Sequence, residues 1–233
     1  MGCVIDYRPA NGRFVTRAEG RTTWHSFSFG AHYDPGNIGV GSLVAHNDER
    51  LPPGTGYADH PHADVEIVTW VLAGALRHTS TVGSGVVGPG QVQRLSAGSG
   101  VVHSEVADGA GETRFLQAWV RPDEADLAPG YLAADVTPGE GWTRVADGDG
   151  GGVVPLASRG TSLDAADLRA GAVLPLPEAE HLHLFVARGQ LMLGERALGP
   201  GDAARLVAEG GRPVTAETDT HVVVWGFRRP VRG

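Results

Sequence analysis

Short runs of β-branched and aromatic residues alternate with turns rich in glycine and proline along most of the chain. Residues 65–72, VEIVTWVL, form such a run, and residues 91–95, 101–106 and 115–120 have a similar extended character. Residues 83–90 carry glycine and proline so densely that we expect hairpins there. A chain of many short strands and tight turns predicts an all-β fold, either a sandwich or a barrel.

The pattern changes between residues 121 and 152, which are acidic and rich in glycine and proline and therefore typical of an exposed connection. Beyond this segment the earlier pattern partly repeats, since a Gly-Pro-Gly turn at residues 199–201 matches one at residues 88–90. We therefore predict an internal duplication. The two predicted domains are residues 1–132 and residues 133–233.

Composition and charge narrow the functional classes. The 233 residues are 41% hydrophobic and 20% charged, which is typical of a globular protein. The net charge is -8 and basic residues cluster only at Arg228, Arg229 and Arg232, so direct binding to nucleic acid or to an anionic membrane is disfavoured. Cys3 is the only cysteine, which excludes an intrachain disulfide. Without a signal-peptide pattern or an apolar run of about 18 residues, we expect a soluble cytoplasmic protein.

Two pairs of polar residues indicate a metal site. His60 and His62 are separated by one residue, and so are His103 and Glu105. Alternate side chains of a strand project from the same face, so each pair can bind one ion from one side. Neutral imidazoles suit Fe, Ni, Cu, Co and Zn, and a carboxylate adds negative charge. Two such strands facing one another would therefore hold a divalent transition metal.

The donor set leaves the role of that metal open. In a six-coordinate complex, four protein ligands leave two positions for dioxygen, water or an anionic oxygen ligand. A closed, tetrahedral structural zinc site would use the same four groups. The residue types therefore predict a metal but do not decide between catalysis and structure.

Longer motifs around these residues resemble those of the cupin superfamily. The matching positions have the spacing Gly54-x5-His60-x-His62-x3-Glu66-x7-Gly74 and then Gly90-x5-Ser96-Ala97-Gly98, followed by His103. The segment WHSFSFGAHYDPGN at residues 24–37, together with the HPH and HSE tripeptides, resembles more closely the pirin family of bicupins. The resemblance covers most of residues 7–132 with strong motifs and residues 155–227 more faintly.

The resemblance implies a fold, a site and a cofactor. The implied fold is two cupin barrels in one chain, each a double-stranded β-helix or jelly-roll, with a metal in the N-terminal barrel and a degenerate C-terminal barrel. Carried over position by position, the family's metal ligands fall on His60, His62, His103 and Glu105. The family metal is usually iron, so we expect one Fe(II), with Ni, Cu, Co, Mn and Zn as alternatives.

The chain departs from the general cupin pattern at Glu66. In most cupins the glutamate of the first motif is a ligand, and here there is one extra residue between Glu66 and Gly74. The pirin pattern explains this shift, because its ligand carboxylate follows the second-motif histidine. Strand alternation still turns Glu66 toward the ligand face. We expect it to orient a ligand histidine, with direct ligation as the alternative.

The pirin resemblance implies an oxidoreductase, a metal-dependent dioxygenase that opens the central ring of flavonols such as quercetin with O2. Glu105 would then also act as the base that takes the proton of the substrate hydroxyl. The alternative is a non-enzymatic, iron-binding regulatory protein whose redox state alters binding of a protein partner. A third hypothesis, an isomerase with a histidine base, is disfavoured by the paired ligands. Likeness of fold does not decide between these functions.

Several other residues receive a structural interpretation. The single histidines are expected to be surface or hydrogen-bonded residues: His25, His32, His46, His78 and His221. His181 and His183 repeat the His-x-His spacing, but no second pair follows, so we expect the C-terminal cupin to have lost its metal. Three aromatic residues on strand candidates are expected in the core: Trp70, Phe115 and Trp119. Gln117 and Trp119 are two residues apart, so their side chains project from the same face of the strand. Gln117 is therefore a candidate cavity residue.

Overall fold

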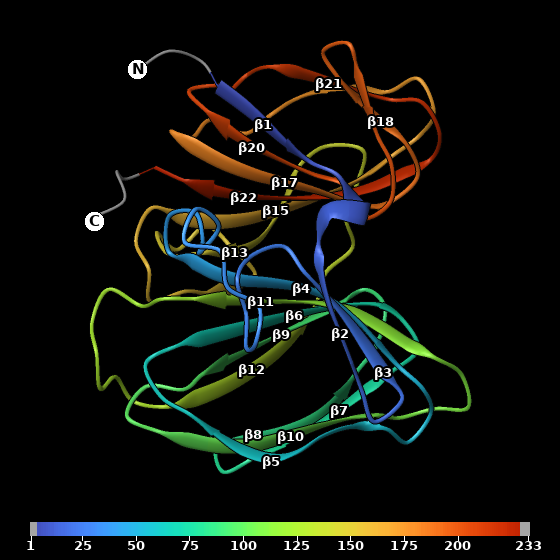
Figure 1. Ribbon diagram of the computed structural model, residues 1–233. Coiled ribbons are helices and arrows are strands. Elements are labelled where there is room, and N and C mark those ends of the chain that lie inside the picture. The colour runs from blue at the N-terminus through green and yellow to red at the C-terminus, as the bar shows by residue number, and fades with distance from the viewer. Residues whose placement is uncertain (1–3, 229–233) are drawn as a thin grey trace. The chain divides into compact units, whose positions relative to one another are not determined.

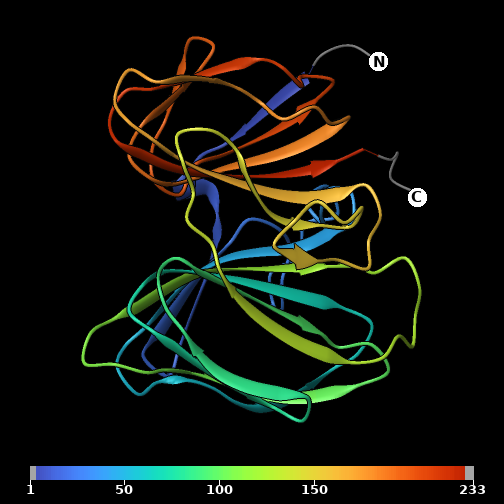
Figure 2. The same cartoon turned by 180° about the vertical axis from the view of Figure 1, so that it is seen from behind.

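The computed structural model describes residues 4–228, and within this range the chain is almost entirely β-strand (Figures 1 and 2). One short 3-10 helix, η1 (Ala10–Gly12), separates the first two strands. The chain divides into two compact units, one of residues 14–136 and the other of the residues before 14 together with those after 136. We call them the N-terminal and the C-terminal barrel. The predicted all-β class is confirmed.

The N-terminal barrel consists of two sheets that face each other (Figure 1). A 7-stranded sheet has the order β12-β9-β6-β11-β4-β3-β2, and a 4-stranded sheet has the order β5-β10-β7-β8. The strands are β2 (Phe14–Ala18), β3 (Arg21–His25), β4 (Leu43–Leu51), β5 (Gly56–His62), β6 (Glu66–Ala73), β7 (Leu76–Ser80), β8 (Gly83–Val87), β9 (Gln91–Ser96), β10 (Val101–Ala107), β11 (Thr113–Val120) and β12 (Gly130–Asp135).

The C-terminal barrel repeats this arrangement. Its 7-stranded sheet has the order β1-β20-β17-β22-β15-β13-β14, and its 4-stranded sheet has the order β16-β21-β18-β19. The strands are β1 (Val4–Arg8), β13 (Thr143–Asp147), β14 (Val154–Pro155), β15 (Thr161–Leu168), β16 (Val173–Pro175), β17 (His181–Arg188), β18 (Leu191–Leu193), β19 (Arg196–Leu198), β20 (Ala203–Val207), β21 (Pro213–Ala216) and β22 (Thr220–Phe227).

The matching strand orders agree with an internal duplication. The Gly-Pro-Gly turn at residues 88–90 joins β8 to β9, and the one at residues 199–201 joins the equivalent strands β19 and β20. The equivalent edge strand of each barrel comes from a different part of the chain. β12 pairs with β9, whereas β1, from the start of the chain, takes the equivalent place beside β20. A division at residue 132 would therefore cut β12 in two and separate β1 from its sheet.

The acidic, glycine-rich segment of residues 121–152 is not only a connection, because it contains β12 and β13. Most side chains of β12 are exposed or half-buried, so its composition resembles that of a loop. Residues 130–135 form a strand because their backbone pairs with β9. The hydrophobic pattern of the sequence does not reveal such pairing.

The two barrels have different interiors. The C-terminal barrel contains one large apolar cluster that includes Leu184, Leu191 and Val224. The N-terminal barrel has smaller apolar clusters, such as one around Phe115 and one around Leu95, and it buries more polar side chains than the C-terminal barrel does. Such a polar interior is costly unless its groups bind each other or a ligand, so it marks the N-terminal barrel as the place to look for function.

The second His-x-His pair does not correspond to the first. His181 and His183 lie on β17, which matches β6 in strand order, whereas His60 and His62 lie on β5. The equivalent of β10 in the C-terminal barrel is β21. The similarity of spacing between the two histidine pairs is therefore coincidental.

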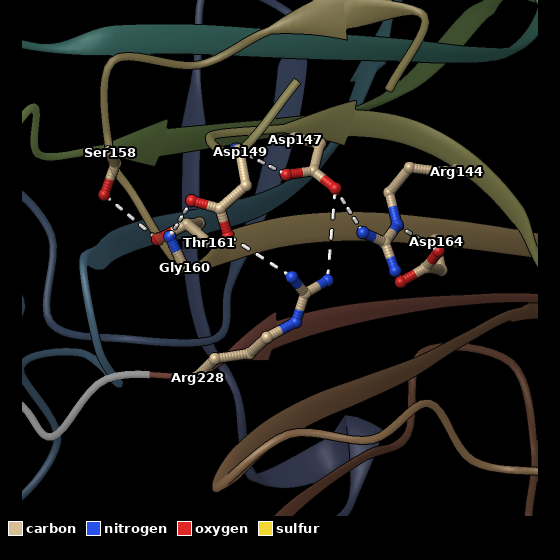
Figure 3. A network of polar contacts seen from close by, with 8 residues as sticks. All are labelled: Arg144, Asp147, Asp149, Ser158, Gly160, Thr161, Asp164 and Arg228. Atoms are coloured by element: carbon tan, nitrogen blue, oxygen red, sulfur yellow. Dashed lines mark hydrogen bonds and ion pairs between the residues drawn. The ribbon is translucent and has the colours of Figure 1, made fainter. Parts of the chain in front are cut away.

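A network of ion pairs joins three parts of the C-terminal barrel (Figure 3). Arg144 on β13 pairs with Asp147 and donates a hydrogen bond of 2.6 Å to Asp164 on β15. Arg228, just after β22, reaches Asp149 at 3.3 Å. Burial raises the pKa of the Asp164 carboxyl, while the hydrogen bond and the charge of Arg144 act in the opposite direction. The network holds the described C-terminal end against β13 and β15.

Within residues 4–228 the chain has no helix with the length and apolar character needed to cross a bilayer. Cys3, Arg229 and Arg232, on which some sequence-based expectations depend, lie outside the described residues.

Candidate metal centre

The two predicted ligand pairs lie on neighbouring antiparallel strands, β5 and β10. His103 stands opposite His60 in the ladder, and Val101 stands opposite His62. The ring centroids of His60 and His103 are 4.3 Å apart, and those of His62 and His103 are 5.0 Å apart. Pro61 is tolerated between the two histidines because β5 is an edge strand, where a missing backbone donor breaks no ladder on the outer side.

A bulge between the two strands shapes the site. The ladder shifts between His103 and Glu105, so that Glu105 pairs with Tyr57 instead of a residue nearer His60. Tyr57 and His60 are an odd number of residues apart, yet both line the same cavity together with His62. Simple alternation would place Tyr57 on the opposite face, so the bulge adds this phenol to the site.

The candidate ligand atoms form two overlapping groups. Those of His60, His62 and His103 lie within 4.8 Å of one another, and so do those of His78, His103 and Glu105. The structure therefore brings three of the four predicted ligands into one group, and Glu105 joins them through the shared His103. His78, expected to be a surface or hydrogen-bonded residue, is instead 1% exposed and stands beside this set.

The imidazole nitrogens of this set are available to a metal. His60 Nδ1 lies 2.7 Å from the carbonyl oxygen of Ala58, which can only accept, so Nδ1 carries the proton and Nε2 keeps its lone pair. His62 Nε2 and both ring nitrogens of His103 are buried and find no hydrogen-bond partner within residues 4–228, whereas His78 Nδ1 faces Glu105 Oε1 at 3.9 Å. Buried imidazole nitrogens without a partner are costly, and a bound cation would satisfy them.

The electrostatic setting also suits a cation. Burial lowers the pKa of His62, and it lowers that of His103 to about 4, so both imidazoles are neutral at physiological pH. Burial by itself would raise the pKa of Glu105, but His78, His103 and a hydrogen bond from Gln117 outweigh it and lower that pKa. Neutral imidazoles beside an ionised carboxylate are the donor types that divalent transition metals bind.

Two glutamines hold the carboxylate of Glu105 in place. Gln93 Nε2 donates to Oε1 at 2.9 Å, and Gln117 Nε2 donates to Oε2 at 2.8 Å. The orientation of each amide is set by a further donor, because Trp119 Nε1 donates to the Gln117 oxygen at 3.2 Å and Tyr131 Oη to the Gln93 oxygen at 3.1 Å. The prediction that Gln117 lines the cavity is confirmed.

A cavity of about 360 Å³ opens beside these residues and is lined by His60, His62 and Glu105 among others. Its aromatic wall includes Phe29, whose ring meets that of Trp119 edge to face with centroids 5.0 Å apart. This volume falls within the range of about 300–1,000 Å³ that is usual for small-molecule sites. The cavity can therefore take a small molecule next to the candidate ligands, against an aromatic wall.

The remaining predictions have mixed outcomes. Trp70 and Phe115 are buried as expected, whereas Trp119 is only half-buried and lines the cavity. Glu66 is fully buried and accepts a hydrogen bond of 3.3 Å from Arg94, and it belongs to neither group of candidate ligands among the described residues. The other single histidines make side-chain hydrogen bonds as expected: His25, His32, His46 and His221.

Sequence reasoning missed Gln93, His78 and Glu49. Gln93 had no clear signal, because its strand, QVQRLS, is mostly polar, unlike the apolar strand that contains Gln117. His78 had none, because its strand meets β10 only in the folded barrel, where His78 pairs with Glu105. Glu49 lies in a run of polar residues on β4 that carries no hydrophobic alternation.

Comparisons with known proteins agree with this picture. A sequence model of the Pirin family matches residues 8–120. A Mycobacterium tuberculosis protein with the provisional name of a quercetin 2,3-dioxygenase is 42% identical over 97% of this chain and 96% of its own length. A "Pirin-like protein" of Caulobacter vibrioides is 32% identical over 86% of this chain and 89% of its own. The crystal structure of the Escherichia coli pirin YhhW with nickel(II) has a TM-score of 0.89 and 26% identity, covering 97% of this chain and 100% of that one.

Proposed function

The chain belongs to the pirin family of bicupins, and on that premise we propose that it is a metal-dependent dioxygenase that oxidises flavonols with O2. The main support is the meeting of unpartnered imidazole nitrogens and an ionised carboxylate at the wall of a cavity suited to a flat phenol. When bound, a divalent transition metal would supply a Lewis-acidic, redox-active centre with open positions. We propose Fe(II) as the native ion.

The proposed ligands are His60, His62, His103 and Glu105. His60, His62 and Glu105 line the cavity, so an ion held by them would be open to a substrate there. His78 belongs to the second group, but its ring stacks on that of Tyr131 with centroids 4.6 Å apart. We therefore assign His78 a packing role behind His103.

The chain's own residues would bind and orient the substrate. Phe29 and Trp119 present aromatic surface to the cavity and can stack against the rings of a flavonol. His62 itself packs against Trp119, with ring centroids 4.8 Å apart, so the stacking surface continues to the ligand set. Enclosure by these rings excludes water and holds the reacting oxygen of the substrate near the proposed ligands.

Oxygen uptake with quercetin tests this function. Protein loaded anaerobically with Fe(II) is expected to consume O2 in proportion to quercetin, and protein stripped with a chelator is expected to consume none. Parallel loading with Ni(II), Co(II), Mn(II), Cu(II) and Zn(II) identifies the metal that supports turnover, and elemental analysis of protein as purified identifies the metal bound. Full turnover by metal-free protein would contradict the mechanism. Tight metal binding without O2 uptake on any flavonol would favour a regulatory protein instead.

A substitution at Gln117 tests whether this residue orients the carboxylate of Glu105. Gln117→Leu removes one of the two amide donors to that carboxylate, so the carboxylate loses its orientation. We expect the affinity for the proposed metal to fall about 10- to 100-fold, as is usual when a group behind a ligand is removed. Gln91→Leu is the matched control, because Gln91 donates to Asp135 away from the site. Equal dissociation constants for wild-type protein and Gln117→Leu in a competition titration would rule this role out.

A further inference from the structure

Glu49 is a buried acid of the same cavity that the proposed metal ligands do not include. It lies on β4, is 2% exposed and belongs to the cavity lining. Its Oε2 accepts two hydrogen bonds, from Thr23 Oγ1 at 2.5 Å and from Tyr57 Oη at 2.9 Å. No residue among 4–228 donates a hydrogen bond to Oε1. One oxygen is thus anchored, and the other is left for a molecule in the cavity.

Tyr57 connects Glu49 to the proposed metal centre. Its ring centroid lies 6.1 Å from that of His60, and its backbone pairs with Glu105. The guanidinium of Arg21 lies over the Tyr57 ring at 4.3 Å. Burial and the charge of Glu49 raise the pKa of Tyr57, so the phenol stays protonated and remains a donor. Glu49 and three of the proposed ligands, His60, His62 and Glu105, line the same cavity, so a substrate bound there can lie next to both.

We propose that Glu49 accepts the proton of the substrate hydroxyl in this cavity, an inference that depends on the proposed flavonol oxidation. In this step the O–H bond of the substrate breaks, its electron pair stays on the substrate oxygen, and the proton moves to Oε1 of Glu49. After oxidation by O2, the proton returns to the product or passes to water. Glu49 undergoes no net change.

The geometry favours Glu49 over Glu105 for this role. Both oxygens of Glu105 already accept amide hydrogens, from Gln93 and from Gln117, and Glu105 is also a proposed ligand. A carboxylate occupied in this way has little capacity left for a substrate proton. Glu49 has one oxygen without a donor and lies outside the proposed ligand set.

The surroundings of Glu49 set its basicity. The pKa of its carboxyl is raised from 4.5 to about 7, because burial and the charges of Glu105 and Asp48 together outweigh the hydrogen bonds from Thr23 and Tyr57, which lower it. On the neighbouring strands Glu49 stands opposite Thr23 of β3 and Phe115 of β11, and the cation of Arg21 lies over the Tyr57 ring. A base must be ionised to act, so kcat/KM should rise with pH through about 7 and level off above it.

Mixing quercetin with Fe(II)-loaded protein under nitrogen measures this proton transfer without turnover, because the deprotonated flavonol absorbs at longer wavelength. In Glu49→Gln we expect anion formation and kcat/KM to fall about 10²- to 10⁴-fold, the usual contribution of a positioned base. The rise of kcat/KM near pH 7 should disappear. Metal content and melting temperature should be unchanged. Glu112→Gln, an exposed acid, is the control for loss of one negative charge.

A second variant separates basicity from folding. Thr23→Val keeps the shape of the side chain but removes a hydrogen bond that lowers the pKa of Glu49. The rise in its pH profile is therefore expected to move to higher pH, with a similar plateau. A residue with a merely structural role would not shift this profile.

The outcomes distinguish the two proposals. If Glu49→Gln forms the anion as fast as wild-type protein and keeps the rise near pH 7, Glu49 is not the proton acceptor, although the oxidation stands. If wild-type protein forms the anion in a Glu49-dependent way but consumes no O2, the dioxygenase proposal fails and the role of Glu49 stands. Failure of the Fe(II)-loaded protein to bind quercetin would overturn both.

Discussion

His62→Ala is expected to abolish both metal retention and flavonol turnover. The substitution removes an imidazole whose Nε2 is buried and finds no hydrogen-bond partner within residues 4–228, and it opens the packing against Trp119. Loss of a direct ligand should reduce metal affinity by more than the roughly 10- to 100-fold effect of losing a group behind a ligand. Elemental analysis after gel filtration should find metal only at background level, and O2 uptake should fall to background.

The chain provides a matched control for this experiment. His181 is the first histidine of the other His-x-His pair and lies in the C-terminal barrel on β17, outside both candidate ligand groups. His181→Ala should retain wild-type metal content and wild-type turnover. Full metal content in His62→Ala would show that the ion is held elsewhere, and the group of His78, His103 and Glu105 would then be the first alternative to test.

Gly98→Ala is expected to lower the free energy of unfolding by about 3 kcal/mol, combining the left-handed backbone penalty with overpacking. Gly98 has a φ of +45°, and a Cβ atom there would lie 1.9 Å from the carbonyl oxygen of Leu127. That carbonyl accepts a hydrogen bond from the amide of Ser99, and the carbonyl of Gly98 accepts one from the amide of Asp64. The turn therefore cannot move without breaking hydrogen bonds on both sides.

Thermal denaturation measures this effect, and for a chain of this length about 3 kcal/mol corresponds to a fall of roughly 6–12 °C in Tm. Gly109→Ala is the control, because a Cβ atom there meets nothing within 4 Å and its φ is not positive. Since the turn directly precedes β10, Gly98→Ala should also weaken metal binding through His103. A variant with the Tm of wild-type protein would show that this turn tolerates a side chain.

Much of the fold could be predicted because its determinants are local. The strands β6, β10 and β11 coincide closely with runs rich in β-branched or aromatic residues, and the repeated Gly-Pro-Gly turns indicate the duplication. β12 and β1 were harder to place, because both are edge strands whose positions depend on backbone pairing with β9 and β20. Such pairing has no side-chain signature in either segment.

The candidate site was predicted in part for the same reason. The pairs formed by His60 with His62 and by His103 with Glu105 depend on one spacing within one strand, which alternation makes readable. By contrast, β4 buries His46, Asn47, Asp48 and Glu49 in succession. From its sequence such a polar run is predicted to be exposed, because the sequence does not show the hydrogen-bond partners of these buried side chains. Asp48, for example, receives two hydrogen bonds of 2.9 Å from Arg114 on β11.

By itself, the amino-acid sequence determined the β class, the duplication and the two residue pairs able to bind a metal, because turn chemistry and strand alternation act over a few neighbouring positions. Only the tertiary structure decided that β1, from the start of the chain, completes the C-terminal barrel, that a bulge turns Tyr57 toward His60, and that Glu49 lines the cavity. It also decided that His78 and Gln93 lie beside Glu105. These features depend on strands far apart in the chain, where register and burial are set by the closing of the barrel.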